Sequence, residues 1–189
     1  MKAITFCMVC SLSLLVSGCF VSTKPPGDTG FARVATLEAF DGCYANVGAG
    51  GKDSGPQFLS AIIWPNTGAD HKSIEYVKVI AEQGNSMHVS AIGASHVILE
   101  GWYVEGKDFT FADGQIKLKS YVKGSAGTEP GNPFIGVGTG STTLGLDASG
   151  NGRSVTSGSF GGVVFLVLPV AGHVSDAARF EKLATCNEG

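Results

Sequence analysis

Two short turns separate three apolar segments in the middle of the chain and restrict how this region can fold. The turns lie at Gly106-Lys107 and Asp113-Gly114, and each has the length and the glycine typical of a two-residue β-hairpin loop. Such loops predict four cross-strand pairs: Val104 with Phe109, Trp102 with Phe111, Phe111 with Ile116, and Phe109 with Leu118. Both turns place the six apolar side chains on one face. We therefore predict a three-stranded antiparallel meander.

The rest of the chain also favours strands over helices. Alternating apolar residues in 73–82 and 86–93, on either side of Gly84-Asn85, predict a second hairpin. Glycine is frequent, at 28 of 189 residues, and charged residues make up 15% against about 25% in an average globular protein. We predict a mainly β fold, namely a single antiparallel β-barrel or sandwich of about 8–10 strands with a C-terminal helix.

Four further segments refine this picture. Residues 161–170 are almost entirely apolar, which predicts a strand buried on both faces. Ser175 and Asp176 can cap a terminal helix that ends near Ala184. The glycines and prolines of 124–140 predict a long loop. Residues 56–65, which lie between two prolines, fit either a short helix or a buried strand.

The N-terminus has the pattern of an export signal. Lys2 precedes the uncharged, mainly apolar stretch Ile4 to Val16, which is too short to span a bilayer as a helix. The following Ser17-Gly18-Cys19 completes a segment that resembles the lipobox of bacterial lipoproteins. This resemblance implies cleavage before Cys19, a thioether-linked lipid on Cys19, and an acyl chain such as palmitate on the new amino terminus. The alternative is an ordinary secretory signal, with Cys19 as a simple thiol.

The resemblance also predicts the domain organisation and the location. Residues 1–18 are the expected signal peptide, 19–35 the lipidated cysteine with a proline-containing linker, and 36–189 one β-rich globular domain. Lipoproteins that stay in the inner membrane often have Asp after the cysteine, whereas this chain has Phe20. The expected location is therefore the cell envelope, with the outer membrane favoured over the inner membrane.

Two cysteines remain once Cys19 carries lipid and the signal peptide is removed. These are Cys43 and Cys186, and an exported domain with two cysteines most often pairs them. We predict a disulfide between them, the alternative being two buried free thiols.

No pattern in the chain indicates catalysis, a cofactor or a metal site. The four histidines, His71, His88, His96 and His173, are not spaced as a zinc ligand set. Cleavage before Cys19 removes Lys2 and no acidic residue, so the net charge changes from −3 to −4, and no basic cluster suggests nucleic acid. We predict that the chain is not an enzyme and has no cofactor beyond the covalent lipid.

The leading functional prediction is a membrane-anchored envelope lipoprotein with a non-catalytic binding or scaffolding role and an envelope protein as partner. Gly42, followed two residues later by Tyr44, resembles the first motif of lipocalin-type barrels without its tryptophan. That resemblance implies an alternative, a carrier of a small apolar ligand. Its cavity would be lined by Trp64, Trp102, Phe109 and Phe111, which otherwise fill the core. Another alternative is an inhibitor of a foreign hydrolase that acts through the loop 124–140.

Overall fold

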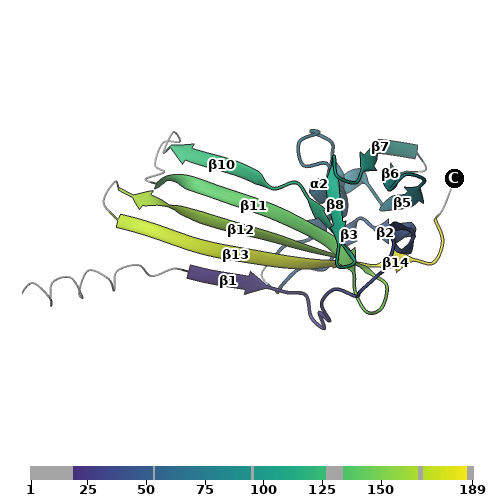
Figure 1. Cartoon of the computed structure of the whole chain (residues 1–189), viewed down its shortest axis with the longest axis horizontal. Coiled ribbons are helices and arrows are strands. Elements are labelled where there is room, and N and C mark those ends of the chain that lie inside the picture. The colour runs from purple at the N-terminus through teal and green to yellow at the C-terminus, as the bar shows by residue number, and fades with distance from the viewer. Residues whose placement is uncertain (1–18, 53, 95, 127–133, 166–167, 187–189) are drawn as a thin grey trace, which may run out of the picture. The chain divides into compact units, whose positions relative to one another are not determined.

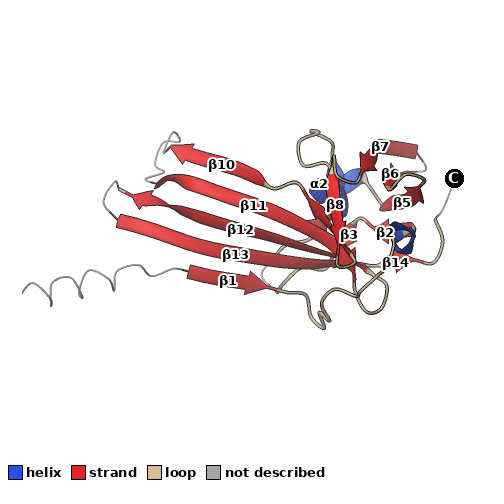
Figure 2. Cartoon of the chain, viewed as in Figure 1, coloured by secondary structure: helices blue, strands red, loops and turns tan. Residues whose placement is uncertain are grey.

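The computed structural model describes residues 19–52, 54–94, 96–126, 134–165 and 168–186, and most of them lie in β-strands (Figure 2). The expected signal peptide, residues 1–18, lies outside the described residues. The short helices are η1 (Leu37–Phe40), α2 (Leu59–Ile63) and η2 (His71–Ser73). No helix in the described part of the chain is long and apolar enough to cross a membrane.

The strands form three separate sheets. The seven-stranded sheet has the order β1-β13-β12-β11-β9-β8, with β10 also paired to β11, and the five-stranded sheet has the order β14-β2-β5-β6-β7. The third sheet is the pair β3 and β4. The bounds are β1 Cys19–Thr23, β2 Gly42–Ala45, β3 Val47–Gly48, β4 Gln57–Phe58, β5 Tyr76–Glu82, β6 Ser86–Gly93, β7 His96–Val104, β8 Phe109–Ala112, β9 Gln115–Leu118, β10 Tyr121–Ala126, β11 Phe134–Leu146, β12 Gly152–Val164, β13 Leu168–Phe180 and β14 Lys182–Leu183.

The mainly β prediction is thus confirmed, and separate sheets are consistent with a sandwich. The described residues show no closed barrel. The chain divides into two compact units. Unit 1 comprises residues 1–22, 120–140 and 157–175, and unit 2 comprises 23–119, 141–156 and 176–189.

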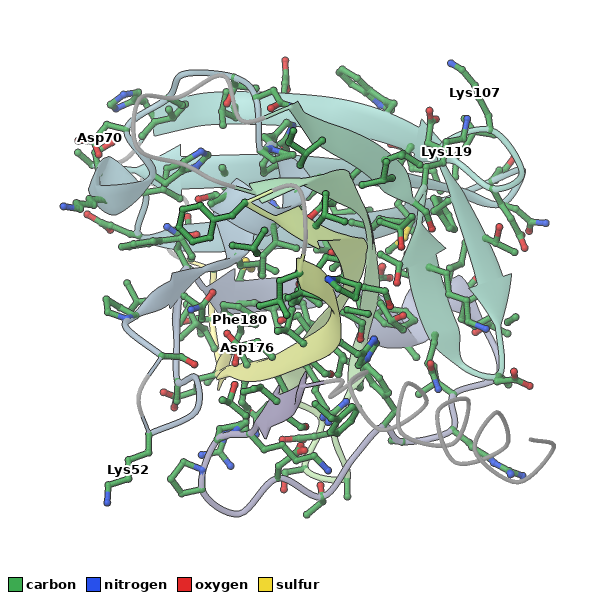
Figure 3. The ribbon with its side chains drawn as sticks, turned by 90° about the vertical axis from the view of Figure 1, so that its left-hand side faces the viewer. Lys52, Asp70, Lys107, Lys119, Asp176 and Phe180 are labelled. Atoms are coloured by element: carbon green, nitrogen blue, oxygen red, sulfur yellow. A yellow bond between two sulfur atoms is a disulfide. The ribbon has the colours of Figure 1, made fainter. Side chains whose placement is uncertain are left out.

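Unit 2 contains a hydrophobic core between strands of the two large sheets. Val77, Val89 and Tyr44 belong to the five-stranded sheet, and Phe180 and Ile116 belong to the seven-stranded sheet. Phe180 is completely buried and lies in the interior in Figure 3. Every buried core residue that the structure describes belongs to unit 2.

Two local predictions in unit 2 are confirmed. Strands β5 and β6 form the expected hairpin, in which Val79 pairs with Val89 and Val77 with Ala91. Strands β8 and β9 pair Phe109 with Leu118 and Phe111 with Ile116, in the predicted register. Asp113 and Gly114 in their turn both have positive φ, as a type I′ turn requires.

The first half of the predicted meander is wrong, because the chain changes sheets after Val104. A tight turn does form, with the Lys107 N–H donating to the Val104 carbonyl, but β7 pairs with β6 and not with β8. In that register Tyr103 lies opposite the buried Met87, so Tyr103 faces the core and Trp102 faces out. Burial, together with the nearby negative charge of Asp108, raises the pKa of Tyr103 to about 12.

The predicted C-terminal helix is also wrong, since residues 175–180 complete β13 and β14 follows. Arg179 is exposed between the buried Ala178 and Phe180, which is the alternation of a strand. Its backbone exchanges two hydrogen bonds with Ala49, each 2.9 Å long. The residues expected to cap a helix form side-chain hydrogen bonds to other segments, Ser175 with Ser157 and Asp176 with Ser54.

The structure also corrects the predictions for 124–140 and 161–170 and resolves the alternative left open for 56–65. Part of the predicted loop 124–140 is strand, because β10 ends at Ala126 and β11 begins at Phe134, while residues 127–133 lie outside the described residues. The apolar run 161–170 ends one strand and begins the next, and its described side chains are not buried. Residues 56–65 contain both the two-residue strand β4 and the helix α2.

The predicted linker is packed onto the protein. Asp28 accepts two hydrogen bonds from the Arg153 guanidinium, at 2.6 Å from Nε and 2.7 Å from Nη2, and both side chains are only 6% exposed. The guanidinium carbon also lies 4.3 Å from the centre of the Phe31 ring. Residues 28–31 are therefore fixed in unit 2 and do not behave as an extended spacer.

The disulfide predicted between Cys43 and Cys186 is present. It joins the completely buried Cys43 of β2 to the segment after β14, over a sequence separation of 143 residues. Cys43 packs against Tyr76 and Ile92, with Leu183 nearby.

Candidate functional site

Unit 1 carries most of the exposed apolar surface. Of the 15 large hydrophobic residues with exposed side chains among the described residues, ten belong to this unit. They are Phe20, Val21, Tyr121, Val122, Ile135, Val137, Phe160, Phe165, Leu168 and Val174. Exposed apolar residues gathered on one part of a protein usually mark a contact surface.

The sequence of unit 1 is almost free of charge. Within 19–22, 120–140 and 157–175, the charged residues are Lys123 and Glu129. Longer uncharged runs cover 130–146 and 154–175. By contrast, Lys52, Asp70, Lys107 and Lys119, all in unit 2, point away from the protein in Figure 3.

The unit is one layer of long strands, in the order β1, β13, β12, β11 and β10 (Figure 1). Side-chain hydrogen bonds fix the register of the central hairpin, since Ser157 bonds to Ser175 and Ser159 to His173. Continued along the strands, this register places Val164 opposite Leu168. In β11, Gly136, Gly138 and Gly140 occupy one face, and the Tyr121 ring of β10 lies over Gly140, where a Cβ would clash with it.

Strand β1 joins this sheet beside β13. The Phe20 ring stacks on His173, with ring centres 5.3 Å apart, and Thr23 Oγ1 donates a hydrogen bond to Asp176. Thr23 and Asp176 lie three residues after Phe20 and His173 in their own strands, so β1 runs parallel to β13. Cys19 is the first residue of β1 and therefore belongs to the folded sheet.

The turn after β12 begins with an unusual residue. Phe165 has a φ of 51° and is 73% exposed. Turns of unit 2 have Asn85, Asp113 and Gly150 at positive φ, and the turn between β6 and β7 has Ala94. All four are smaller than phenylalanine, and a bulky residue in this conformation is disfavoured.

Three of the four aromatic residues predicted to line a ligand cavity lie in or against the hydrophobic core of unit 2, and Trp102 lies outside it. Trp64 is buried and contacts Tyr103 edge to face, while Phe111 makes the same kind of contact with Phe40. Trp102 is 58% exposed and stacks on His88 at 4.4 Å. Of the four, Phe109 lines the apolar cavity in unit 2.

That cavity has a volume of about 100 Å³, and Phe40, Met87, Leu146 and Phe180 also line it. A second hollow, of about 220 Å³, lies between residues 35–38 and Glu82, Asn85, Glu105 and Phe111. Pockets that hold drug-sized ligands measure roughly 300–1,000 Å³. Both volumes fall below that range, which gives no support to the carrier alternative.

In unit 2, another serine and histidine lie in contact, within a buried hydrogen-bond network. His71 Nδ1 lies 3.0 Å from Ser60 Oγ, but Ser60 is completely buried. The buried Asn46 accepts from the Ser60 N–H and donates to the carbonyls of His71 and Ile74. This network fastens α2 and η2 to the chain after β2.

The predicted histidines are scattered. His88 lies 3.5 Å from Glu100, and His173 packs against Phe20. No group of three or more His, Cys, Asp or Glu side chains that could hold a metal ion occurs in the part of the chain that the structure describes.

One feature of the sequence, the absence of charged residues, indicates that much of unit 1 is not an exposed loop. Alternating glycines in 134–140 indicate a loop when considered alone, yet they lie within 17 consecutive uncharged residues. An exposed loop would be expected to contain charged or polar residues, so the missing charge was the informative feature.

Comparison with models of known families, with curated proteins and with solved structures finds no match for this chain.

Proposed function

We propose that this protein is a lipid-anchored protein of the bacterial cell envelope, with a non-catalytic binding or scaffolding role. The observation that carries the proposal is the lipobox-like Leu15-Val16-Ser17-Gly18-Cys19, which leads directly into a strand of the folded sheet. A lipid on Cys19 would hold unit 1 close to the membrane without an intervening spacer. The outer membrane is the favoured location, because Phe20 and not Asp follows Cys19.

Two other features support this assignment. The Cys43–Cys186 disulfide is typical of a protein that folds in an oxidising compartment, as an exported lipoprotein does. The exposed apolar surface of unit 1 supports a binding role, because such surfaces most often contact a partner or a membrane.

Replacing Cys19 with serine is expected to abolish lipid attachment. Intact mass spectrometry of the protein from membranes should show the acyl mass on the wild type and none on Cys19→Ser. Cys10→Ser is the matched control, because Cys10 lies within the expected signal peptide and its loss should leave the mass of the mature protein unchanged. An unaltered lipid mass on Cys19→Ser would overturn the proposal.

The binding role is tested separately. Chemical crosslinking in intact cells, followed by purification of the protein, should recover a defined envelope protein in stoichiometric amount. We expect the crosslinked positions to fall in unit 1. Crosslinks confined to unit 2 would contradict a binding role for the exposed sheet.

A further inference from the structure

We infer that the apolar turn end of unit 1 inserts into the lipid bilayer surface and forms a second membrane contact beside the lipid on Cys19. We define this apolar tip as Phe165, Leu168, Val164 and Val170. The inference rests on the proposed function, since it identifies the membrane as what the tip of the exposed sheet contacts.

The first argument is the exposed side chains of the tip. Phe165 and Leu168 are 73% and 53% exposed, and Val164 and Val170 flank them half-buried. Burying a Phe or Leu side chain in an apolar phase gains roughly 1.5–3 kcal/mol each. No charged residue occurs in 154–175, so no charge would have to enter the apolar region of the membrane with the tip.

The second argument is the conformation of Phe165. Asn or Gly would suit its φ of 51° better, and the positions with positive φ in turns of unit 2 hold small residues such as Asn85, Ala94 and Gly114. Selection for folding alone would favour a small or polar residue at this position. An exposed phenylalanine is instead what a membrane-inserting turn requires, since aromatic and aliphatic side chains supply the apolar contact at interfaces.

The third argument is the position of the tip relative to Cys19 within one sheet. Phe20 packs beside His173, and Leu168 precedes His173 by five residues. At about 3.3 Å per residue, the start of β13 lies about 17 Å from Phe20 along the strand. A lipid on Cys19 would thus hold the tip within reach of the same bilayer.

The backbone limits how deeply the tip can enter. Strands β1 and β10 form the edges of this sheet, and open edges are not tolerated in the hydrocarbon interior. Insertion is therefore restricted to the turn, to a depth of about 5–10 Å, as for other interfacial segments. With Cys19 at the headgroups, the strands must lie at a shallow angle to the membrane plane.

The test uses the mature chain with Cys19→Ser, exported behind a secretory signal so that the disulfide forms. Without the covalent lipid, it should still float with phosphatidylcholine vesicles, to the same extent at low and high NaCl. Adding Phe165→Asn and Leu168→Asn should reduce partitioning at least about tenfold. Stability in urea should stay equal or rise, because Asn suits a positive φ.

Matched controls come from unit 2. Trp102→Asn and Val97→Asn replace side chains that are 58% and 52% exposed outside the tip, and vesicle binding should be unchanged. Phe165→Trp in the same background should show bromolipid quenching of the new tryptophan at shallow depth, measured against the signal of Trp64 and Trp102.

Several results would overturn the inference. One is an absence of flotation of the Cys19→Ser chain, and another is an equal loss in the unit 2 controls. A third is self-association of a chain that does not bind vesicles, seen in sedimentation experiments and abolished in the tip variants. That result would assign the tip to contact with a second copy of the chain. Because the vesicle assay uses lipid-free protein, its outcome is independent of whether Cys19 is lipidated in cells.

Discussion

Asp28→Ala is expected to destabilise the folded protein by about 3–5 kcal/mol, because it leaves the buried Arg153 guanidinium without its counter-charge. The two hydrogen bonds to Asp28, at 2.6 and 2.7 Å, are the shortest polar contacts described for Arg153. Urea denaturation followed by circular dichroism measures the loss as a lower transition midpoint. The change should appear without any change in lipid attachment.

Glu100→Ala is the matched control. Glu100 lies 3.5 Å from His88, and its side chain is 51% exposed, so its loss should cost less than about 1 kcal/mol. A double variant, Asp28→Leu with Arg153→Met, should recover much of the stability, since replacing both members of a buried pair is often close to neutral. Equal and small effects of Asp28→Ala and Glu100→Ala would contradict the structural role of the pair.

The same pair predicts a pH dependence. The hydrogen bond from Arg153 lowers the pKa of the Asp28 carboxyl below its usual 3.8 and outweighs desolvation, which acts in the opposite direction. A carboxyl with a lowered pKa stabilises the fold fully above its unfolded pKa, and this contribution is lost as the pH falls through the folded pKa. The stability difference between wild type and Asp28→Ala should therefore be constant near neutral pH and shrink below about pH 4.

Removal of the disulfide by Cys43→Ala with Cys186→Ala is expected to cost about 2–5 kcal/mol. The bridge closes a loop set by a separation of 143 residues, which strongly restricts the unfolded chain. Thermal unfolding with and without reductant measures the effect. Reductant should lower the midpoint of the wild type and leave the double variant unchanged, and a wild type insensitive to full reduction would contradict the prediction.

The sequence predicted structure best where the partners are close together in the chain. The β5–β6 and β8–β9 hairpins follow from short turns and alternating apolar residues. The prediction for β7 was wrong because Trp102 and Tyr103 can each face inward, and the pairing with β6, the strand directly before β7, decides between them. The prediction of the terminal helix was wrong because Asp176 bonds to Ser54, a partner far away in the sequence, and Ser175 bonds to the neighbouring strand.

The candidate site was only partly accessible to sequence reasoning. The disulfide could be predicted from the expected oxidising compartment, because two cysteines remained to pair. Lipidation of Cys19 stays a prediction. Of the aromatic residues offered as a ligand-binding set, Trp64, Phe109 and Phe111 pack in or against the core, whereas Trp102 is exposed. The exposed sheet was not predicted, because the glycines in its strands favour the prediction of a loop.

The parallel pairing of β1 with β13 has a consequence for biogenesis. Strand β1 cannot acquire its neighbour until residues 168–180 have been synthesised. The Cys43–Cys186 bridge imposes the same delay, because Cys186 follows β13 in the chain. Contacts of such long range form slowly. A chain interrupted before residue 168 would leave β1 as an unpaired strand, so the pairing of β1 depends on the synthesis of β13.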